Sequence, residues 1–306
     1  MNISPVIAIC YDFDGTLSPG NMQEHGFLQE LGMEPEEFWL KCDDFCRRRR
    51  VDRVLGYMRF MIEEAGARGI KITKAMLREF GSRIPLFPGM DSTWFMRISG
   101  LGYASGVEVR HYIISSGLRE MIEGVSVEGL EFSRFFHNIF ASSYLYGDDG
   151  SAEWPAMAVN YTGKTQFIFR ISKGCENIDD DRTVNQLVSE NIRTVPLSNM
   201  IYVGDGSTDI PCMRLIRNFG GRAVSVYDPS KTVARRLAHE IVSCGRADIA
   251  APADYREGGI LDSAVSRMVS SIIYNIELRT FARTECIREK QMKKRWQAEQ
   301  HQTPEA

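Results

Sequence analysis

Two pairs of aspartates, each after an apolar run, have the residue type and spacing that suit metal binding or catalysis. The first pair, Asp12 and Asp14, follows the run Val6–Tyr11. At a spacing of two in an extended chain both side chains point the same way, and carboxylates so close repel unless a cation lies between them. Such a pair suits Mg²⁺, which prefers oxygen ligands, and leaves one carboxylate to act as an attacking group. For these residues alone, a solvated turn rich in aspartate is the alternative.

The second pair, Asp205 and Asp209, follows the apolar run 200–203. A helix that starts near Ser207 would put Asp209 in its first turn, close to Asp205. Carboxylates that converge on the first pair make a magnesium site at Asp12, Asp14, Asp205 and Asp209 the favoured interpretation, although an N-capping loop would use the same residues. A dinucleotide-binding loop is excluded, because it needs glycine where Asp209 stands.

A third cluster is suited to hold an anion. Ser115, Ser116 and Gly117 follow the apolar run 111–114 and precede a predicted helix at 118–123, so their hydroxyl and N–H groups could cradle a phosphate. Gly15 permits a tight turn after Asp14, and Thr16 adds a further hydroxyl and N–H group. Helix capping without catalysis is the alternative for the serines.

Lys164, in the segment Gly163-Lys164-Thr165, supplies a positive charge for phosphoryl oxygens. A P-loop is excluded, because that motif needs glycine where this chain has Ala158. A solvated surface lysine is the alternative.

The elements that must position these residues form an α/β pattern. Apolar, β-branched runs at 6–11, 111–114, 200–203 and 223–226 each end at polar residues, with helical patterns between them. This predicts a doubly wound parallel sheet, whose ligands bind beyond the carboxyl ends of the strands.

The predicted domain organisation has a catalytic core interrupted by an insert. Residues 20–87 show only helical spacing, so we expect a small helical domain inserted after the first strand, with the core formed by 1–19 and 88–275. A β-hairpin is expected around 139–171 because of the turn signal at 147–150. Residues 276–306 are expected to form a basic helix whose end, 299–306, is frayed.

Composition excludes several classes of function. The net charge of −3 and the 43% hydrophobic content indicate a soluble globular protein, with no nucleic-acid or membrane partner expected. Seven scattered cysteines predict reduced thiols and a cytoplasmic location, and their spacing does not favour zinc. The run Arg47–Arg50 is interpreted as a solvated helix face, with attraction of an anion as the alternative.

The order Asp-x-Asp, Ser, Lys, Gly-Asp-x-x-x-Asp resembles the four motifs of the haloacid dehalogenase superfamily, over about residues 1–20 and 88–265. The helical insert directly after the first motif is similar to the cap of its phosphoserine-phosphatase-like branch. The resemblance implies that Asp12 attacks phosphorus and that Asp14 acts as general acid and base. It implies Mg²⁺ held by Asp12, the Asp14 carbonyl, Asp205 and Asp209, and phosphoryl oxygens held by Ser115 and Lys164.

The expected activity is hydrolysis of a small phosphorylated metabolite through an aspartyl-phosphate. Phosphoserine phosphatases usually carry serine after the second aspartate and glutamate nine residues after the first, where this chain has Gly15 and Asn21. We therefore expect a substrate other than phosphoserine. Phosphotransfer to another alcohol, or a catalytically silent binding protein, are the alternatives. Phe27, Trp39 or Met58 could line the substrate pocket.

Overall fold

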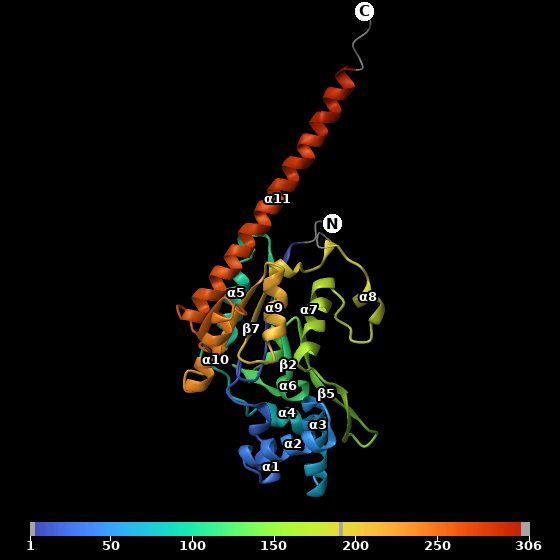
Figure 1. Cartoon of the computed structure of the whole chain (residues 1–306), viewed down its shortest axis with the longest axis vertical. Helices are drawn as coiled ribbons and strands as arrows, with labels where there is room; N and C mark the ends of the chain where they lie inside the picture. The colour runs from blue at the N-terminus through green and yellow to red at the C-terminus, as the bar shows by residue number, and fades with distance from the viewer. Residues whose placement is uncertain (1–3, 190–191, 301–306) are drawn as a thin grey trace, which may run out of the picture.

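The protein is built on a seven-stranded sheet, with strand order β6-β5-β2-β1-β7-β8-β9 (Figure 1). The computed structural model describes residues 4–189 and 192–300. All neighbouring strands are parallel except β5 and β6, which pair antiparallel. The predicted parallel α/β sheet is therefore confirmed. The strands are β1 (Val6–Tyr11), β2 (Glu108–Leu118), β5 (Asn138–Tyr146), β6 (Ala152–Met157), β7 (Met200–Gly204), β8 (Arg222–Tyr227) and β9 (Ile249–Pro252).

The central strand β1 is apolar throughout because both faces of the sheet are covered. Ile7, Ile9 and Tyr11 pack into the cluster on one face, and the residues between them pack into the cluster on the other. Side chains alternate between faces in a strand, so a strand buried on both sides must be apolar at every position. This is why a continuous apolar run, without alternation of apolar and polar residues, indicates a buried strand here.

Different helices cover the two faces of the sheet. One face packs against α5 (Ser92–Gly100) and the first turns of α11 (Ile260–Gln300). The other packs against α7 (Lys164–Lys173), α9 (Ile210–Asn218) and α10 (Thr232–Ser243). The remaining short elements of the core are α6 (Arg119–Gly124), α8 (Asp181–Asn185) and the two-stranded β3 (Ser126–Val127) and β4 (Leu130–Glu131).

Residues 20–87 are helical, as their apolar spacing predicted, and contain no strand. The segment contains the 3₁₀ turn η1 (Met22–Glu24) and helices α1 (Phe27–Leu31), α2 (Pro35–Arg49), α3 (Arg53–Ala67) and α4 (Lys74–Gly81). These helices lie together at one end of the molecule, at the bottom of Figure 1. The chain enters them from the carboxyl end of β1, so they lie on the side where the sheet presents its polar edge.

Several predicted boundaries are wrong. The hairpin expected around 139–171 ends with β6 at Met157, and α7 follows from Lys164. The strand expected at 111–114 continues to Leu118 through an irregularity after Ser115. The basic C-terminal helix does not begin at 276, because α11 starts at Ile260, where its first turns pack on the sheet. Residues 299 and 300, expected in the frayed tail, belong to α11, and 301–306 lie outside the described residues.

The outer part of α11 extends away from the body of the molecule (Figure 1). Among the described residues, no helix combines the length and apolar character needed to span a membrane.

Candidate active site

Asp12 and Asp14 lie in the turn that follows β1, at the carboxyl edge of the sheet. The N–H of Asp12 donates to the Val203 carbonyl at 3.0 Å, which ties this turn to the end of β7. Gly15 has φ +73°, and a Cβ atom there would lie 2.2 Å from Oδ2 of Asp205. Glycine is therefore needed both for the left-handed backbone of the turn and for the close approach of Asp205.

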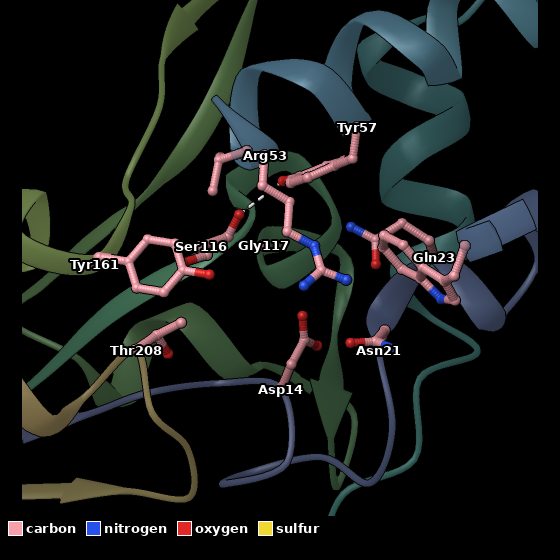
Figure 2. Close-up of a pocket in the computed structure, with 11 residues that line it drawn as sticks. Asp14, Asn21, Gln23, Arg53, Tyr57, Ser116, Gly117, Tyr161 and Thr208 are labelled. Carbon is pink, nitrogen blue, oxygen red and sulfur yellow. Dashed lines mark hydrogen bonds between the residues drawn. The ribbon is translucent and has the colours of Figure 1, made fainter. Parts of the chain in front are cut away.

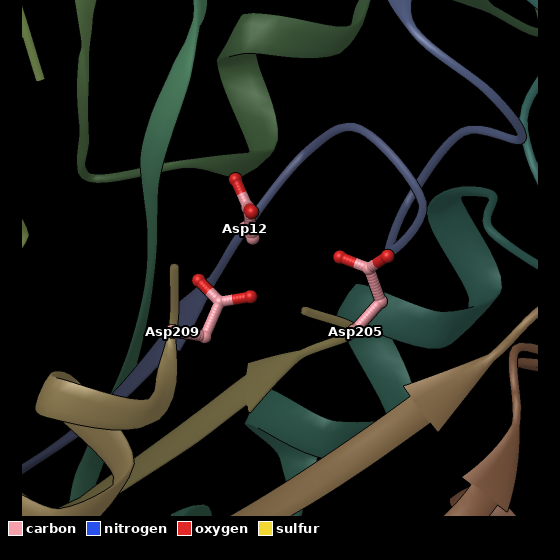
Figure 3. Close-up of side chains that lie close together, drawn as sticks. All are labelled: Asp12, Asp205 and Asp209. Carbon is pink, nitrogen blue, oxygen red and sulfur yellow. The ribbon is translucent and has the colours of Figure 1, made fainter. Parts of the chain in front are cut away.

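Asp12, Asp205 and Asp209 converge, although they come from two distant parts of the chain (Figure 3). One carboxylate oxygen from each lies within 4.8 Å of the others. Asp205 follows β7 directly, whereas Asp209 is the residue before α9, which begins at Ile210 and not near Ser207 as predicted. Oxygens of three carboxylates at this separation are the ligands that Mg²⁺ prefers, so these residues fit a magnesium ion.

Lys164 is the cation of this cluster. It is fully buried, and its Nζ lies 2.7 Å from Oδ2 of Asp12 and 2.8 Å from Oδ1 of Asp209. The Tyr202 hydroxyl donates to the same Asp209 oxygen at 2.8 Å, and the Gly206 N–H donates to Oδ2 at 3.1 Å. The ion pair with Asp209 thus holds the Lys164 ammonium group next to Asp12. The sequence did not predict this contact between Lys164 and Asp209.

Three carboxylates and one ammonium group form the cluster, and burial and mutual repulsion shift the pKa values of its carboxyl groups. Burial and the Asp209 carboxylate raise the pKa of Asp12 to about 6, although Lys164 lowers it. Burial, followed by repulsion from Asp209 and Asp12, raises the pKa of Asp205 well above its ordinary value. Burial lowers the pKa of Lys164, but the two carboxylates raise it by more, so its ammonium group stays charged. One ammonium cannot neutralise three carboxylates, and a divalent cation would.

Binding of Mg²⁺ is expected to weaken as the pH falls below about 6, because metal ligation requires deprotonated carboxylates. The apparent Kd should rise by about tenfold per pH unit for each proton that competes. In the metal-free protein, a pKa raised on folding makes Asp12 contribute stability at low pH, which is lost as the pH rises from about 4 to about 6. Thermal-shift titrations with MgCl₂ between pH 5 and pH 8 measure both trends. A Kd that does not change between pH 5 and pH 7 would contradict this assignment.

Asp14 stands apart from the carboxylate cluster and lines a cavity instead. Its Oδ1 accepts a 3.0 Å hydrogen bond from the Met22 N–H, which connects it to η1. Burial and repulsion from Asp12 raise the pKa of Asp14 well above its ordinary value, although the Met22 bond lowers it. A carboxyl group whose pKa is raised keeps its proton to higher pH, which suits general acid catalysis. The Asp14 contact with metal through its backbone carbonyl stays a prediction.

Of the predicted phosphate-binding residues in this loop, Ser116 and Gly117 share the cavity with Asp14, whereas Ser115 is not among the residues that line it. Ser115 is fully buried and its Oγ accepts a 3.0 Å hydrogen bond from the Gly117 N–H. Ser116 and Gly117 line the cavity, and the Ser116 carbonyl accepts a 2.6 Å bond from the Tyr57 hydroxyl. A Cβ atom on Gly117 would lie 2.1 Å from Cε of Met22, so the Met22 side chain would have to shift to accommodate a larger residue here.

The structure does not bring Thr16 to the cavity. Thr16 is fully buried, and its N–H donates to the Phe13 carbonyl at 3.2 Å. Its carbonyl accepts a 2.7 Å bond from the Tyr255 hydroxyl. Through these backbone hydrogen bonds, Thr16 stabilises the turn that carries Asp12 and Asp14. The contact of Thr16 with phosphate stays a prediction.

The cavity has a volume of about 320 Å³ and lies between the sheet edge and the helical segment (Figure 2). Trp39 lines it, whereas Phe27 and Met58, the other predicted pocket residues, are fully buried. The lining residues are Asp14, Asn21, Gln23, Trp39, Arg53, Val54, Tyr57, Ser116, Gly117, Tyr161 and Thr208. Most of these were not predicted, because the helical spacing of residues 20–87 indicates which side chains share a face but not which face meets the site.

The arginine run Arg47–Arg50 is exposed at the end of α2, in agreement with the solvated face that was predicted. It is absent from the cavity lining. Arg53 differs from the run, because it starts α3 and points into the cavity above Asp14 (Figure 2).

The buried acidic centre and its paired lysine lie at the carboxyl edge of a parallel α/β sheet, where proteins of this fold class bind their ligands. Residues 9–214 match the family model of the haloacid dehalogenase-like hydrolases. The chain belongs to this family.

Similar proteins agree with this membership. An uncharacterized protein of Borreliella burgdorferi is 27% identical over 280 residues, which cover 83% of this chain and 93% of that protein. A probable phosphoserine phosphatase from Vibrio cholerae superposes with a TM-score of 0.53 at 14% identity, covering 90% of this chain and 67% of that one. A haloacid dehalogenase family hydrolase from Salmonella enterica serovar Typhi superposes with a TM-score of 0.50 at 18% identity, covering 78% and 67%. These likenesses show a shared fold.

Proposed function

We propose that this protein is a Mg²⁺-dependent phosphomonoester hydrolase that acts on a small phosphorylated metabolite through an aspartyl-phosphate at Asp12. The observation that carries the proposal is the position of Asp12. Its carboxylate meets Lys164 and two further carboxylates at a sheet edge, and Asp14 faces a cavity beside it. The match to phosphoserine phosphatases supports a phosphate ester as the substrate class, and the small cavity supports a small ester.

The reaction follows from the roles that the geometry supports. The Asp12 carboxylate attacks phosphorus, the ester P–O bond breaks, and the leaving oxygen takes the proton that Asp14 holds. In the second half, Asp14 accepts a proton from water, the water oxygen attacks phosphorus, and the acyl-phosphate bond breaks to release phosphate and restore Asp12. Bound Mg²⁺ would be held by Asp12, Asp205 and Asp209, and would neutralise charge on the phosphoryl group.

Lys164, Ser115 and the N–H groups after it would hold the phosphoryl oxygens. The charge on Lys164 offsets that of the transferring group, which otherwise would repel an attacking carboxylate. We also propose that residues 20–87 act as a cap over a core formed by 1–19 and 88–275, because residues of both line the cavity.

Release of inorganic phosphate from p-nitrophenyl phosphate, with and without MgCl₂, tests the proposed function. We expect turnover that requires Mg²⁺ and is lost on chelation with EDTA. Addition of glycerol as an acceptor distinguishes hydrolysis from phosphotransfer, because a transferase would form a new phosphate ester in place of phosphate. The absence of turnover over a panel of phosphate esters would instead favour a binding protein.

A further inference from the structure

The outer part of α11 exposes large apolar side chains to solvent. The first turns of the helix bury Ile272 and Ile276 against the body of the molecule, and the helix then continues away from the body to Gln300 (Figure 1). Five large apolar side chains of this helix are between 40% and 66% exposed: Tyr274, Leu278, Phe281, Met292 and Trp296. Most helices in proteins are stabilised by packing of an apolar face, so a partner that covers these side chains would stabilise α11.

These five side chains form one face of the helix, here called the outer face of α11. Tyr274, Phe281 and Met292 are separated by seven and eleven residues, and both spacings return to nearly the same side of an α-helix. Leu278 and Trp296 each follow a member of this set by four residues and so lie on the same face. The residues that pack on the body lie on the opposite side of the helix, so a partner can reach the outer face.

The outer face is symmetric about Glu285. Leu278 and Met292 lie seven residues before and after Glu285, and Tyr274 and Trp296 lie eleven residues before and after it. In an antiparallel pair of identical helices, residues equally far from the two-fold axis face one another. With the axis at Glu285, Leu278 would face the partner's Met292, and Tyr274 would face the partner's Trp296. Each of these apolar contacts would form twice.

The charged residues in the middle of the outer face favour the antiparallel orientation. Arg288 lies three residues after Glu285 and Phe281 lies four residues before it, so Arg288 would lie beside the partner's Phe281, whose ring attracts a guanidinium group. Arg288 also forms a 3.0 Å ion pair with Glu285 of its own helix, which would offset the repulsion between the two carboxylates that meet at the axis. A parallel pair would instead place Arg288 beside the partner's Arg288 and bring the basic ends at 290–295 together.

A second copy of the chain fits the outer face better than a membrane or a nucleic acid does. Glu285 and Glu289 lie among its apolar side chains, so an anionic phosphate surface would meet carboxylates there. An antiparallel pair would also place the two bodies at opposite ends. The same side of α11 is exposed along its first turns, at Ser263, Arg267 and Ser270, so the end of the partner helix would meet an open helix surface.

We propose that the protein forms a dimer in which α11 pairs with α11 of a second copy, antiparallel and centred on Glu285. The pairing covers the outer face of both helices. It does not depend on the proposed function, because none of these residues belongs to the candidate active site.

Sedimentation equilibrium of the full-length protein tests the assembly. We expect a mass of two chains for the wild type. The double variant Leu278→Ser with Met292→Ser should weaken dimerisation by at least about 100-fold, because both copies of the contact between these side chains are lost. A wild type that stays monomeric at every concentration measured would overturn the proposal. A double variant that dimerises as tightly as the wild type would do the same.

Ile287→Ser is the matched control. Ile287 is 50% exposed in the same part of the helix, but it lies thirteen residues after Tyr274 and therefore on the opposite side. This substitution lowers helix propensity in the same way as those on the outer face, so we expect it to leave the dimer dissociation constant unchanged. A loss of dimer equal to that of the double variant would show that helix stability, and not the outer face, decides assembly, and would contradict the proposal.

Cysteine cross-linking tests the orientation of the two helices. The exposed Cys244 and Cys286 are first replaced by serine. In that background Glu285→Cys should form a disulfide-linked dimer on mild oxidation, because position 285 meets its own copy at the axis, whereas Leu278→Cys should not. Efficient cross-linking of Leu278→Cys would indicate a parallel pair and overturn the antiparallel arrangement. Binding of a monomeric wild type to phosphatidylserine vesicles or to duplex DNA would overturn the choice of partner.

Discussion

Asp12→Asn is expected to abolish phosphate release, with kcat lowered by roughly 10⁴-fold or more, because the amide cannot attack phosphorus. The fold should survive, since Lys164 keeps its 2.8 Å contact with Asp209 and the Asn oxygen can still accept from Lys164. Steady-state kinetics measures the loss. Mass spectrometry of acid-quenched protein should detect a covalent phosphate in the wild type and none in the variant.

Asp44→Asn is a suitable control for this substitution. Asp44 forms an exposed pair with Arg48 at 2.6 Å within α2. Exposed pairs of this kind contribute little to stability, so this variant should keep the wild-type kcat and Tm. If Asp12→Asn retained more than about a tenth of the wild-type kcat, another residue would have to be the nucleophile.

Lys164→Met is expected to impair both stability and activity. Met fills a similar volume, but Asp12 and Asp209 would then remain buried without their cation. Breaking a buried ion pair from one side costs about 3–5 kcal/mol, so the free energy of unfolding at neutral pH should fall by that amount. Phosphoryl oxygens would also lose their fixed positive charge, and kcat should fall by about 10²-fold or more.

The pH dependence and a double variant separate these two effects of Lys164. Stability of Lys164→Met should recover at low pH, where the carboxylates are protonated and need no partner. The double variant Lys164→Met with Asp209→Asn lacks one of the two carboxylates that Lys164→Met leaves unpaired. Its stability should therefore be higher than that of Lys164→Met, while its activity stays low. Urea denaturation at pH 5 and pH 8 measures the first result. Equal stability of Lys164→Met and wild type at pH 8 would contradict the buried pairing.

Local sequence was sufficient for the strands and for the chemistry at their ends. The run Val6–Tyr11 is apolar at every position because helices cover both faces of the sheet, and that pattern is visible in sequence. The polar residues after β1, β2 and β7 then had to meet, because parallel strands present their carboxyl ends at one edge. The meeting of Asp12, Asp205 and Asp209 was predictable for this reason, whereas Asp14, which was expected with them, lines the cavity instead.

The contacts that side chains make with residues far away in the sequence were not predictable from local sequence. Lys164 reads as a surface lysine in isolation, yet it is fully buried between Asp12 and Asp209 because α7 packs on the sheet. Thr16 reads as an anion ligand, yet its bonds to Phe13 and Tyr255 place it behind the turn.

The sequence by itself determined the sheet, the helical nature of residues 20–87 and the aspartates at the sheet edge. These follow from local patterns of apolarity and from the rule that parallel strands share a carboxyl edge. Only the tertiary structure decided that Asp209 positions Lys164 and that Asp205 requires Gly15. Each of these depends on how segments far apart in the chain are rotated and packed against one another, and helical or strand periodicity does not determine that packing.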